Sequence, residues 1–131
     1  MIVPPISILI SDDDLAFRET LAEMFAPRGF RTILAGDGEQ ALDIVRSEEV
    51  HLVLTDLHMP RLDGLDFIRE ATTIRRPLPC ILMSAGFDRS LMEQARQTAF
   101  SILPKPVRVR DVRGSVELAL RTFYDWTADA S

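Results

Sequence analysis

The amino-acid sequence predicts one α/β domain in which helices cover both faces of a five-stranded parallel sheet. Short apolar runs alternate five times with stretches whose apolar residues recur every three to four positions, the period of a helix. The short runs are apolar at nearly every position, as strands buried on both faces are. Crossovers between parallel strands lie over the faces of the sheet and provide this cover. The length of 131 residues suits a single domain with one core.

Five strands are expected from the short apolar runs. The first, "ISILI", and the second, "FRTILA", are rich in β-branched and other apolar residues. The third, "VHLVLTD", ends on a carboxylate, and the fourth, "PCILMS", ends on a hydroxyl. The fifth, "FSIL", is short and is followed by a proline. In order, the expected strands span residues 6–10, 30–35, 50–56, 79–84 and 100–103.

A stretch with helical periodicity follows each strand. In the first, apolar residues recur from Leu15 to Phe25, and Gly29 is expected to end the helix. Asp14 is the expected cap at its start, since aspartate is a favoured N-cap. The second helix, "DGEQALDIVRSEE", opens at Asp37 or Gly38. The other helices are expected over residues 65–73, 90–99 and 109–125.

Composition limits the classes of function. Fifteen basic and twenty acidic residues give a net charge of −5, which argues against direct nucleic-acid binding by this domain. No apolar run approaches the roughly 18 residues that a membrane helix needs, and the first residues lack the features of a secretory signal. We therefore expect a cytoplasmic protein without membrane contact. The lone Cys80 lies in an apolar run and is expected to be a small buried hydrophobe.

Polar residues gather directly after the predicted strands. Asp12 and Asp13 follow the first strand, Asp56 ends the third, Ser84 ends the fourth and Lys105 follows the fifth. Because the carboxyl ends of parallel strands share one edge of the sheet, these side chains are expected to form one pocket. Clustered carboxylates repel one another unless a cation lies among them. Carboxylates are hard oxygen ligands that suit Mg²⁺, so the sequence predicts a magnesium site beside a phosphate site.

Four segments, "ILISDDD", "LVLTDLHMPRLDG", "ILMSAG" and "FSILPKP", resemble the signature segments of response regulator receiver domains. The resemblance covers about residues 5–125 and is specific because the segments occur together and in order. It implies a doubly wound, CheY-like sheet with strand order 2-1-3-4-5. It also implies that a sensor histidine kinase, or a histidine phosphotransfer protein, passes a phosphoryl group to an aspartate of this chain.

The resemblance assigns roles to the residues of the predicted pocket. Asp56 matches the phosphoacceptor, and Asp12 and Asp13 match the acidic pair that holds Mg²⁺, or Mn²⁺ in its place, together with Asp56. The main-chain carbonyl of His58 matches a further metal ligand. Lys105 matches the lysine that pairs with the phosphoryl group.

The remaining matched positions concern the phosphoryl group and the switch. Ser84 and Ala85 match the residues that contact the phosphoryl oxygens, and Pro106 matches a proline preceded by a cis bond. Ile102 stands at a switch position that is usually aromatic, so the family's ring rotation is not open to this chain. The expected readout is therefore a shift of the loop over residues 84–88. That shift changes the surface of helix 90–99, strand 100–103 and the last helix, a surface that also suits a homodimer.

Other interpretations of the same residues stay open. "ILISDDD" also fits the opening of haloacid-dehalogenase-type phosphatases, in which Asp12 would be the nucleophile of a hydrolase. A pseudo-receiver that keeps the fold and only binds partners is a third possibility. Whether the domain is better described as an enzyme is likewise open, because a receiver assists its own phosphorylation and dephosphorylation. We expect residues 1–131 to form a single receiver domain, with its core over about 5–125 and a short polar tail.

Overall fold

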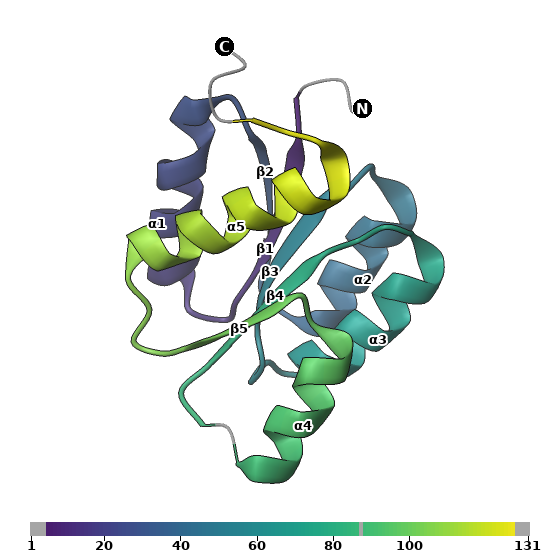
Figure 1. Cartoon of the computed structure of the whole chain (residues 1–131). Coiled ribbons are helices and arrows are strands. Elements are labelled where there is room, and N and C mark those ends of the chain that lie inside the picture. Colours follow the sequence, from purple (N-terminus) through teal and green to yellow (C-terminus); the bar gives the residue numbers. More distant parts are fainter. Residues whose placement is uncertain (1–4, 87, 128–131) are drawn as a thin grey trace.

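The computed structural model describes residues 5–86 and 88–127 and shows a five-stranded parallel sheet with strand order β2-β1-β3-β4-β5 (Figure 1). This confirms the predicted fold class and strand order. The strands are β1 (Ser7–Ser11), β2 (Arg31–Ala35), β3 (Leu52–Asp56), β4 (Cys80–Ser84) and β5 (Ser101–Pro104). The helices are α1 (Leu15–Phe25), α2 (Gly38–Ser47), α3 (Gly64–Ile74), α4 (Arg89–Thr98) and α5 (Val109–Tyr124).

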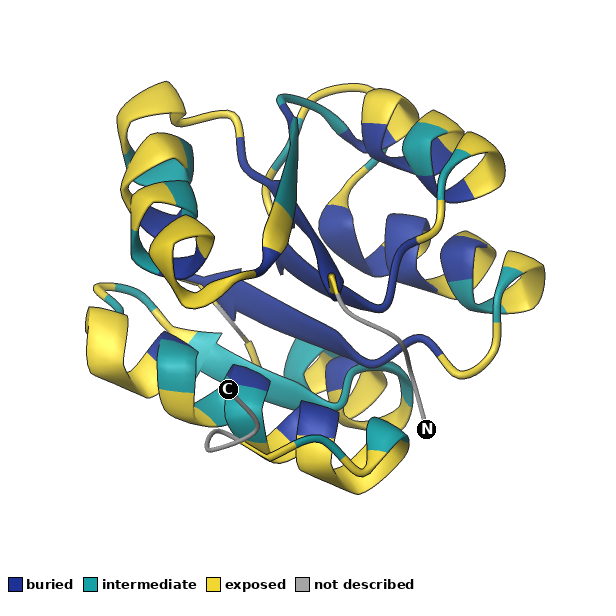
Figure 2. Ribbon diagram, turned by 90° about the horizontal axis from the view of Figure 1, so that it is seen from above, coloured by how far each residue is buried: buried dark blue, intermediate teal, exposed yellow. Residues whose placement is uncertain are grey.

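Helices cover both faces of the sheet, with α1 and α5 on one face and α2, α3 and α4 on the other (Figures 1 and 2). Alternate residues of each inner strand point to opposite faces. In β1, for example, Leu9 packs with the α2–α4 layer, and Ile8 and Ile10 pack with the α1 and α5 layer. The three central strands are buried along their whole length, so charged groups can emerge only at their ends.

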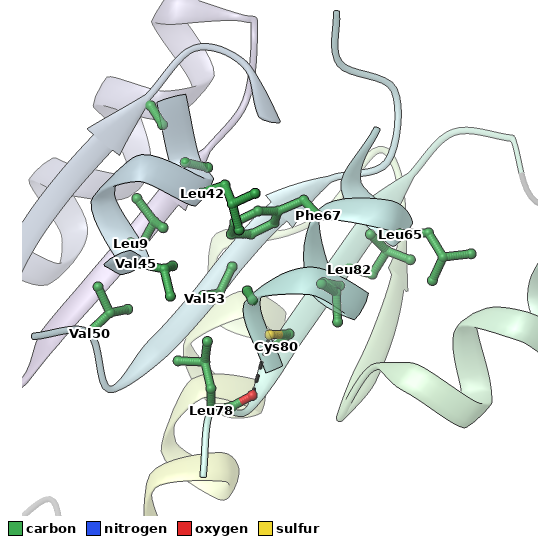
Figure 3. Close-up of a cluster of buried hydrophobic side chains, with 14 of the residues drawn as sticks. Leu9, Leu42, Val45, Val50, Val53, Leu65, Phe67, Leu78, Cys80 and Leu82 are labelled. Atoms are coloured by element: carbon green, nitrogen blue, oxygen red, sulfur yellow. Dashed lines mark hydrogen bonds between the residues drawn. The ribbon is translucent and has the colours of Figure 1, made fainter. Parts of the chain in front are cut away.

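The buried cluster under α2, α3 and α4 contains the lone cysteine (Figure 3). Cys80 is 1% exposed, and its thiol donates a hydrogen bond to the carbonyl of Leu78. Burial raises the pKa of the Cys80 thiol far above its ordinary value, so the group stays protonated at neutral pH. The prediction that Cys80 is a buried hydrophobe is confirmed.

Aspartates begin four of the five helices. The carboxylates of Asp14, Asp37, Asp63 and Asp88 accept hydrogen bonds from backbone N–H groups in the first turns of α1, α2, α3 and α4. This confirms the cap expected at Asp14. At the start of α2, Asp37 is the cap and Gly38 is the first helical residue. Each helix therefore begins at a fixed point shortly after its strand, which holds the connecting loops at the carboxyl edge of the sheet.

Most element ends differ from the sequence prediction by one or two residues, but α1 ends at Phe25, three residues before the end expected from Gly29. β3 begins at Leu52, although Val50 and His51 are buried and the His51 N–H still donates to the carbonyl of Ser7. Helix α1 is followed by a short 3₁₀ turn (Ala26–Arg28), and the chain reverses at Gly29, whose φ is +88°. The Tyr124 hydroxyl donates to the carbonyl of His51 at 2.6 Å and so ties the end of α5 to the sheet.

None of the described helices is both long enough and apolar enough to span a membrane.

Candidate functional site

The strand ends meet at one edge of the sheet because the strands are parallel and nearly in register. Ser11 of β1 lies beside Thr55 of β3, Asp56 lies beside Met83 of β4, and Ser84 lies beside Pro104 of β5. The residues that follow these positions therefore project from the same edge. This arrangement brings together the five polar residues that the sequence placed in one pocket.

Three carboxylates meet at this edge. Oxygen atoms of Asp12, Asp13 and Asp56 all lie within 4.8 Å of one another. Asp12 is fully buried and Asp56 is 6% exposed, whereas Asp13 is exposed. Water screens the two buried carboxylates poorly, so their repulsion is strong and a divalent cation would relieve it. The donor set consists of hard oxygens and has one open side, which fits Mg²⁺.

Lys105 reaches the acidic cluster from the end of β5. Its Nζ donates to Oδ2 of Asp12 at 3.0 Å and lies 3.6 Å from Oδ1 of Asp56. The ammonium also lies 4.8 Å from the centre of the Phe17 ring, a cation–π distance. The Lys105 backbone N–H donates to the carbonyl of Ser84, and the Lys105–Pro106 peptide bond is cis. One ammonium thus stands between two buried carboxylates.

The charges of the cluster perturb one another. Burial and the neighbouring charge of Asp12 raise the pKa of Asp56, and Lys105 opposes this only in part. Burial by itself would lower the pKa of Lys105, but Asp12 and Asp56 outweigh it and leave that pKa raised. Lys105 therefore stays charged at neutral pH. Its single positive charge does not fully offset the burial of the ionised Asp56 carboxylate and the repulsion from Asp12. The cluster can accept more positive charge than Lys105 supplies.

Asp12 is held in place by its own segment. Its Oδ1 accepts from the backbone N–H of Asp14 at 2.9 Å. The Arg18 guanidinium donates to the Asp12 carbonyl at 2.8 Å. The sequence gives no sign of this role for Arg18, because nothing in the pattern of an amphipathic helix shows that an arginine in its second turn reaches back toward the preceding strand. The first contact orients the Asp12 carboxylate, and the second holds the Asp12 backbone.

The sequence profile of the response regulator receiver domain matches residues 8–117 of this chain. This chain belongs to the response regulator receiver domain family. Over 126 residues it is 35% identical to the transcriptional regulatory protein PdtaR of Mycobacterium tuberculosis. That alignment covers 95% of this chain and 61% of PdtaR, so the chain spans about three-fifths of that relative.

Solved receiver structures share the fold. A CheY-like receiver domain protein from Methanospirillum hungatei superposes with a TM-score of 0.87 at 22% identity, over 91% of this chain and 96% of that one. A chain of the CheX-CheY-BeF3-Mg²⁺ complex from Borrelia burgdorferi gives a TM-score of 0.81 at 25% identity, over 88% of this chain and 90% of that one. At 22% identity, the similarity to the Methanospirillum hungatei structure shows a shared fold only.

Ser84 and its loop border the acidic cluster of this receiver domain. Ser84 is 1% exposed, and its hydroxyl accepts a hydrogen bond from the Gly86 backbone N–H at 3.0 Å. Ala85 and His58 are exposed, and a Cβ built on Gly86 would lie 3.9 Å from Nε2 of His58. The imidazole of His58 therefore lies beside the backbone of Gly86. Phe87, in the same loop, lies outside the described residues.

Ile102 leaves room beside the edge strand of the receiver domain. Its side chain is partly buried against the cluster under α2–α4. Next to it lies an open pocket of about 330 Å³, lined by Met92, Arg96, Ala99, Phe100, Ser101, Ile102 and Pro104. A branched aliphatic side chain has no ring to rotate between two positions. A ring rotation is therefore not available at this position.

Replacing Asp56 with asparagine should stabilise the metal-free protein at pH 7. Burial and Asp12 raise the pKa of Asp56, so stability is lost as the pH rises from the ordinary value of 3.8, and the full cost is present above the raised folded-state pKa. Relief equivalent to one pKa unit would be about 1.4 kcal/mol. The gain should fade as the pH falls toward the ordinary value of 3.8, where the wild-type carboxyl is protonated as well. Urea unfolding in EDTA at several pH values measures it.

The matched control for this measurement is Asp43→Asn. Asp43 is an exposed carboxylate on α2 that pairs with Arg46, so removing its charge should leave stability nearly unchanged. An Asp56→Asn protein that is less stable than the wild type in EDTA at pH 7 would show that the cluster is already compensated without a cation.

Proposed function

We propose that this receiver domain accepts a phosphoryl group on Asp56 in a Mg²⁺-dependent reaction, taking it from a phosphohistidine of a sensor histidine kinase or a histidine phosphotransfer protein. The observation that carries the proposal is the convergence of Asp12, Asp13 and Asp56 within 4.8 Å, with Lys105 between Asp12 and Asp56. Family membership supports the same reaction class.

In the proposed reaction an oxygen of Asp56 attacks phosphorus, a P–O bond forms, and the P–N bond to the donor imidazole breaks. Negative charge on the phosphoryl oxygens lies close to the Lys105 ammonium, which stabilises the transition state. Carboxylates of Asp12, Asp13 and Asp56 and the main-chain carbonyl of His58 would hold Mg²⁺, which supplies further positive charge at those oxygens. Mn²⁺ prefers the same hard oxygen ligands and could take its place.

Asp56 is a better acceptor than Asp12. Both carboxylate oxygens of Asp12 are occupied, one by the Asp14 N–H and the other by Lys105, and the side chain is fully buried. Asp56 keeps some exposure, and Lys105 lies on one side of it at 3.6 Å. These contacts support the receiver reaction over a hydrolase in which Asp12 is the nucleophile.

The proposed switch begins at Ser84. Its hydroxyl accepts from the Gly86 N–H in the structure described here. A phosphoryl group on Asp56 offers an acceptor, so we propose that the hydroxyl donates to that group while the Ala85 N–H binds another of its oxygens. The loop over residues 84–88 then moves and changes the α4-β5-α5 surface, without a ring at Ile102. A homodimer through this surface is one output of such a change.

The proposed setting follows from the reaction. A histidine kinase draws its phosphoryl group from ATP, so we place the reaction in the cytoplasm. The net charge of −5 disfavours direct nucleic-acid contact by this domain, and the proposed partners are therefore proteins. We treat residues 1–131 as a single receiver domain, with its fold extending to Tyr124 at the end of α5.

Acetyl phosphate with Mg²⁺ tests the proposal. The wild-type protein should gain the mass of one phosphoryl group, which peptide mass spectrometry locates at Asp56, and EDTA should prevent it. Asp56→Asn should abolish the modification, whereas Asp12→Asn should still be modified at Asp56 when Mg²⁺ is raised. Release of free phosphate that depends on Asp12 would indicate the hydrolase. Absence of modification under every condition would indicate a binding-only pseudo-receiver.

A further inference from the structure

Arg61 has an unusual backbone conformation for its residue type. It lies in the loop between β3 and α3 and has φ of +72°, in the left-handed region that suits glycine or asparagine. Among described residues other than glycine, only Arg61 and Asp125 have positive φ. A long side chain is retained in such a conformation only when surrounding contacts hold it there. The contacts of Arg61 therefore show what holds this loop in its conformation.

The guanidinium of Arg61 is anchored on a neighbouring loop. Its Nη1 donates to Oδ2 of Asp37 at 2.6 Å, across 24 residues of sequence. Oδ1 of the same carboxylate accepts from the Gln40 backbone N–H and caps α2. Asp37 is thus fixed by the helix that it caps, and it offers Arg61 a rigid partner. The ion pair joins the β2–α2 turn to the β3–α3 loop.

Backbone contacts hold the same two loops close together. A Cβ on Gly38 would lie 1.9 Å from the carbonyl oxygen of Leu62, so the β2–α2 turn and the β3–α3 loop touch there. Within the β3–α3 connection, a Cβ on Gly64 would lie 2.1 Å from the carbonyl oxygen of Asp56. The Gly64 N–H also donates to the carbonyl of Leu57 and closes the loop over residues 57–63. His58 lies in this short loop, close to Arg61 in sequence. A displacement of the Arg61 backbone should therefore also move the His58 carbonyl.

We infer that Arg61 is a positioning residue for the divalent cation, acting through Asp37 to hold the loop that presents the His58 carbonyl. The inference rests on the proposed function, because it takes the His58 carbonyl as a metal ligand. In this role Arg61 would contact neither the cation nor the phosphoryl group. Its contribution is to keep one ligand of the site in place before the cation arrives.

Mg²⁺ binding measured by calorimetry, without a phosphodonor, tests the inference on two single variants. Arg61→Asn keeps a residue that tolerates positive φ and removes the guanidinium. Asp37→Asn keeps an N-cap and removes the charge. Each should raise the Kd for Mg²⁺ by about threefold to fivefold, the scale of a partly exposed ion pair. The double variant should be no weaker than either single one, because both remove the same contact.

The sign of the two effects separates positioning from simple electrostatics. Removing the positive charge of Arg61 would by itself tighten binding of a cation, and removing the negative charge of Asp37 would weaken it. If the pair positions the loop, both variants weaken binding. Tighter or unchanged binding in Arg61→Asn would overturn the inference. The matched control is Arg46→Asn, which breaks an exposed ion pair with Asp43 on α2 and should leave the Kd unchanged.

Phosphorylation kinetics add a second readout. With acetyl phosphate, Arg61→Asn should need several times more Mg²⁺ for half-maximal rate but reach nearly the wild-type rate at saturating Mg²⁺. A lower rate at saturation with an unchanged Mg²⁺ requirement would place Arg61 in a different role and would contradict the inference. If the wild-type protein neither binds Mg²⁺ nor takes up a phosphoryl group, the proposed function itself fails, and that result is distinct from an effect confined to the variants.

Discussion

Lys105→Met should reduce the rate of phosphoryl acceptance from acetyl phosphate by about 10²-fold or more, the usual cost of removing one group that stabilises transition-state charge. The Lys105 ammonium lies 3.0 Å from Asp12 and 3.6 Å from Asp56, where the phosphoryl oxygens would gather. Methionine keeps most of the length and volume of the side chain. Single-turnover phosphorylation at saturating Mg²⁺, followed by intact-protein mass spectrometry, measures the rate.

The same substitution should change the protein before any phosphodonor is added. Without the ammonium, burial and Asp12 raise the pKa of Asp56 with less opposition, so the metal-free variant should unfold at lower urea concentration at pH 7. Added Mg²⁺ should recover part of this stability. A Lys105→Met protein phosphorylated at the wild-type rate would remove Lys105 from the proposed mechanism.

Gly64→Ala should destabilise the fold by about 2–3 kcal/mol, because the new methyl group would overlap backbone atoms that cannot move aside cheaply. The added Cβ would lie 2.1 Å from the Asp56 carbonyl oxygen and 3.0 Å from Cα of Leu57. Since Asp56 itself would be pushed, Mg²⁺ affinity should fall as well. Thermal unfolding should show a Tm lower by roughly 6–10 °C.

Gly114→Ala is the matched control within the same chain. Gly114 lies on the exposed side of α5, and nothing approaches within 4 Å of a Cβ built there. Alanine should therefore stabilise α5 by about 0.5–1 kcal/mol through its higher helix propensity. Equal effects of the two substitutions would contradict the interpretation that close backbone approach requires glycine at position 64.

Residue pattern was enough to predict the fold and the neighbourhood of the site. Alternation of apolar runs with helical periodicity has only a few compact solutions, and a parallel sheet brings the ends of its strands to one edge. That is why Asp12, Asp56 and Lys105 could be placed together although 93 residues separate Asp12 from Lys105. Their roles in catalysis stay predictions until the reaction is measured.

The contacts that hold the site could not be predicted in the same way. The pair of Arg61 with Asp37 joins two loops 24 residues apart, and neither residue type is unusual in a polar turn. The return of Arg18 to the Asp12 carbonyl depends on how α1 packs on the sheet, which periodicity alone does not specify. Such long side chains are fixed by tertiary packing, so their partners become visible only in three dimensions.

The most direct test of the central claim is a crystal structure of the protein grown with Mg²⁺ and beryllofluoride, which mimics a phosphoryl group on a carboxylate. We predict that beryllofluoride is bound to Asp56, that the metal ion is coordinated by Asp12 and Asp13, and that the Lys105 ammonium contacts a fluorine atom. Beryllofluoride on Asp12, or a metal ion bound away from these three carboxylates, would contradict the account.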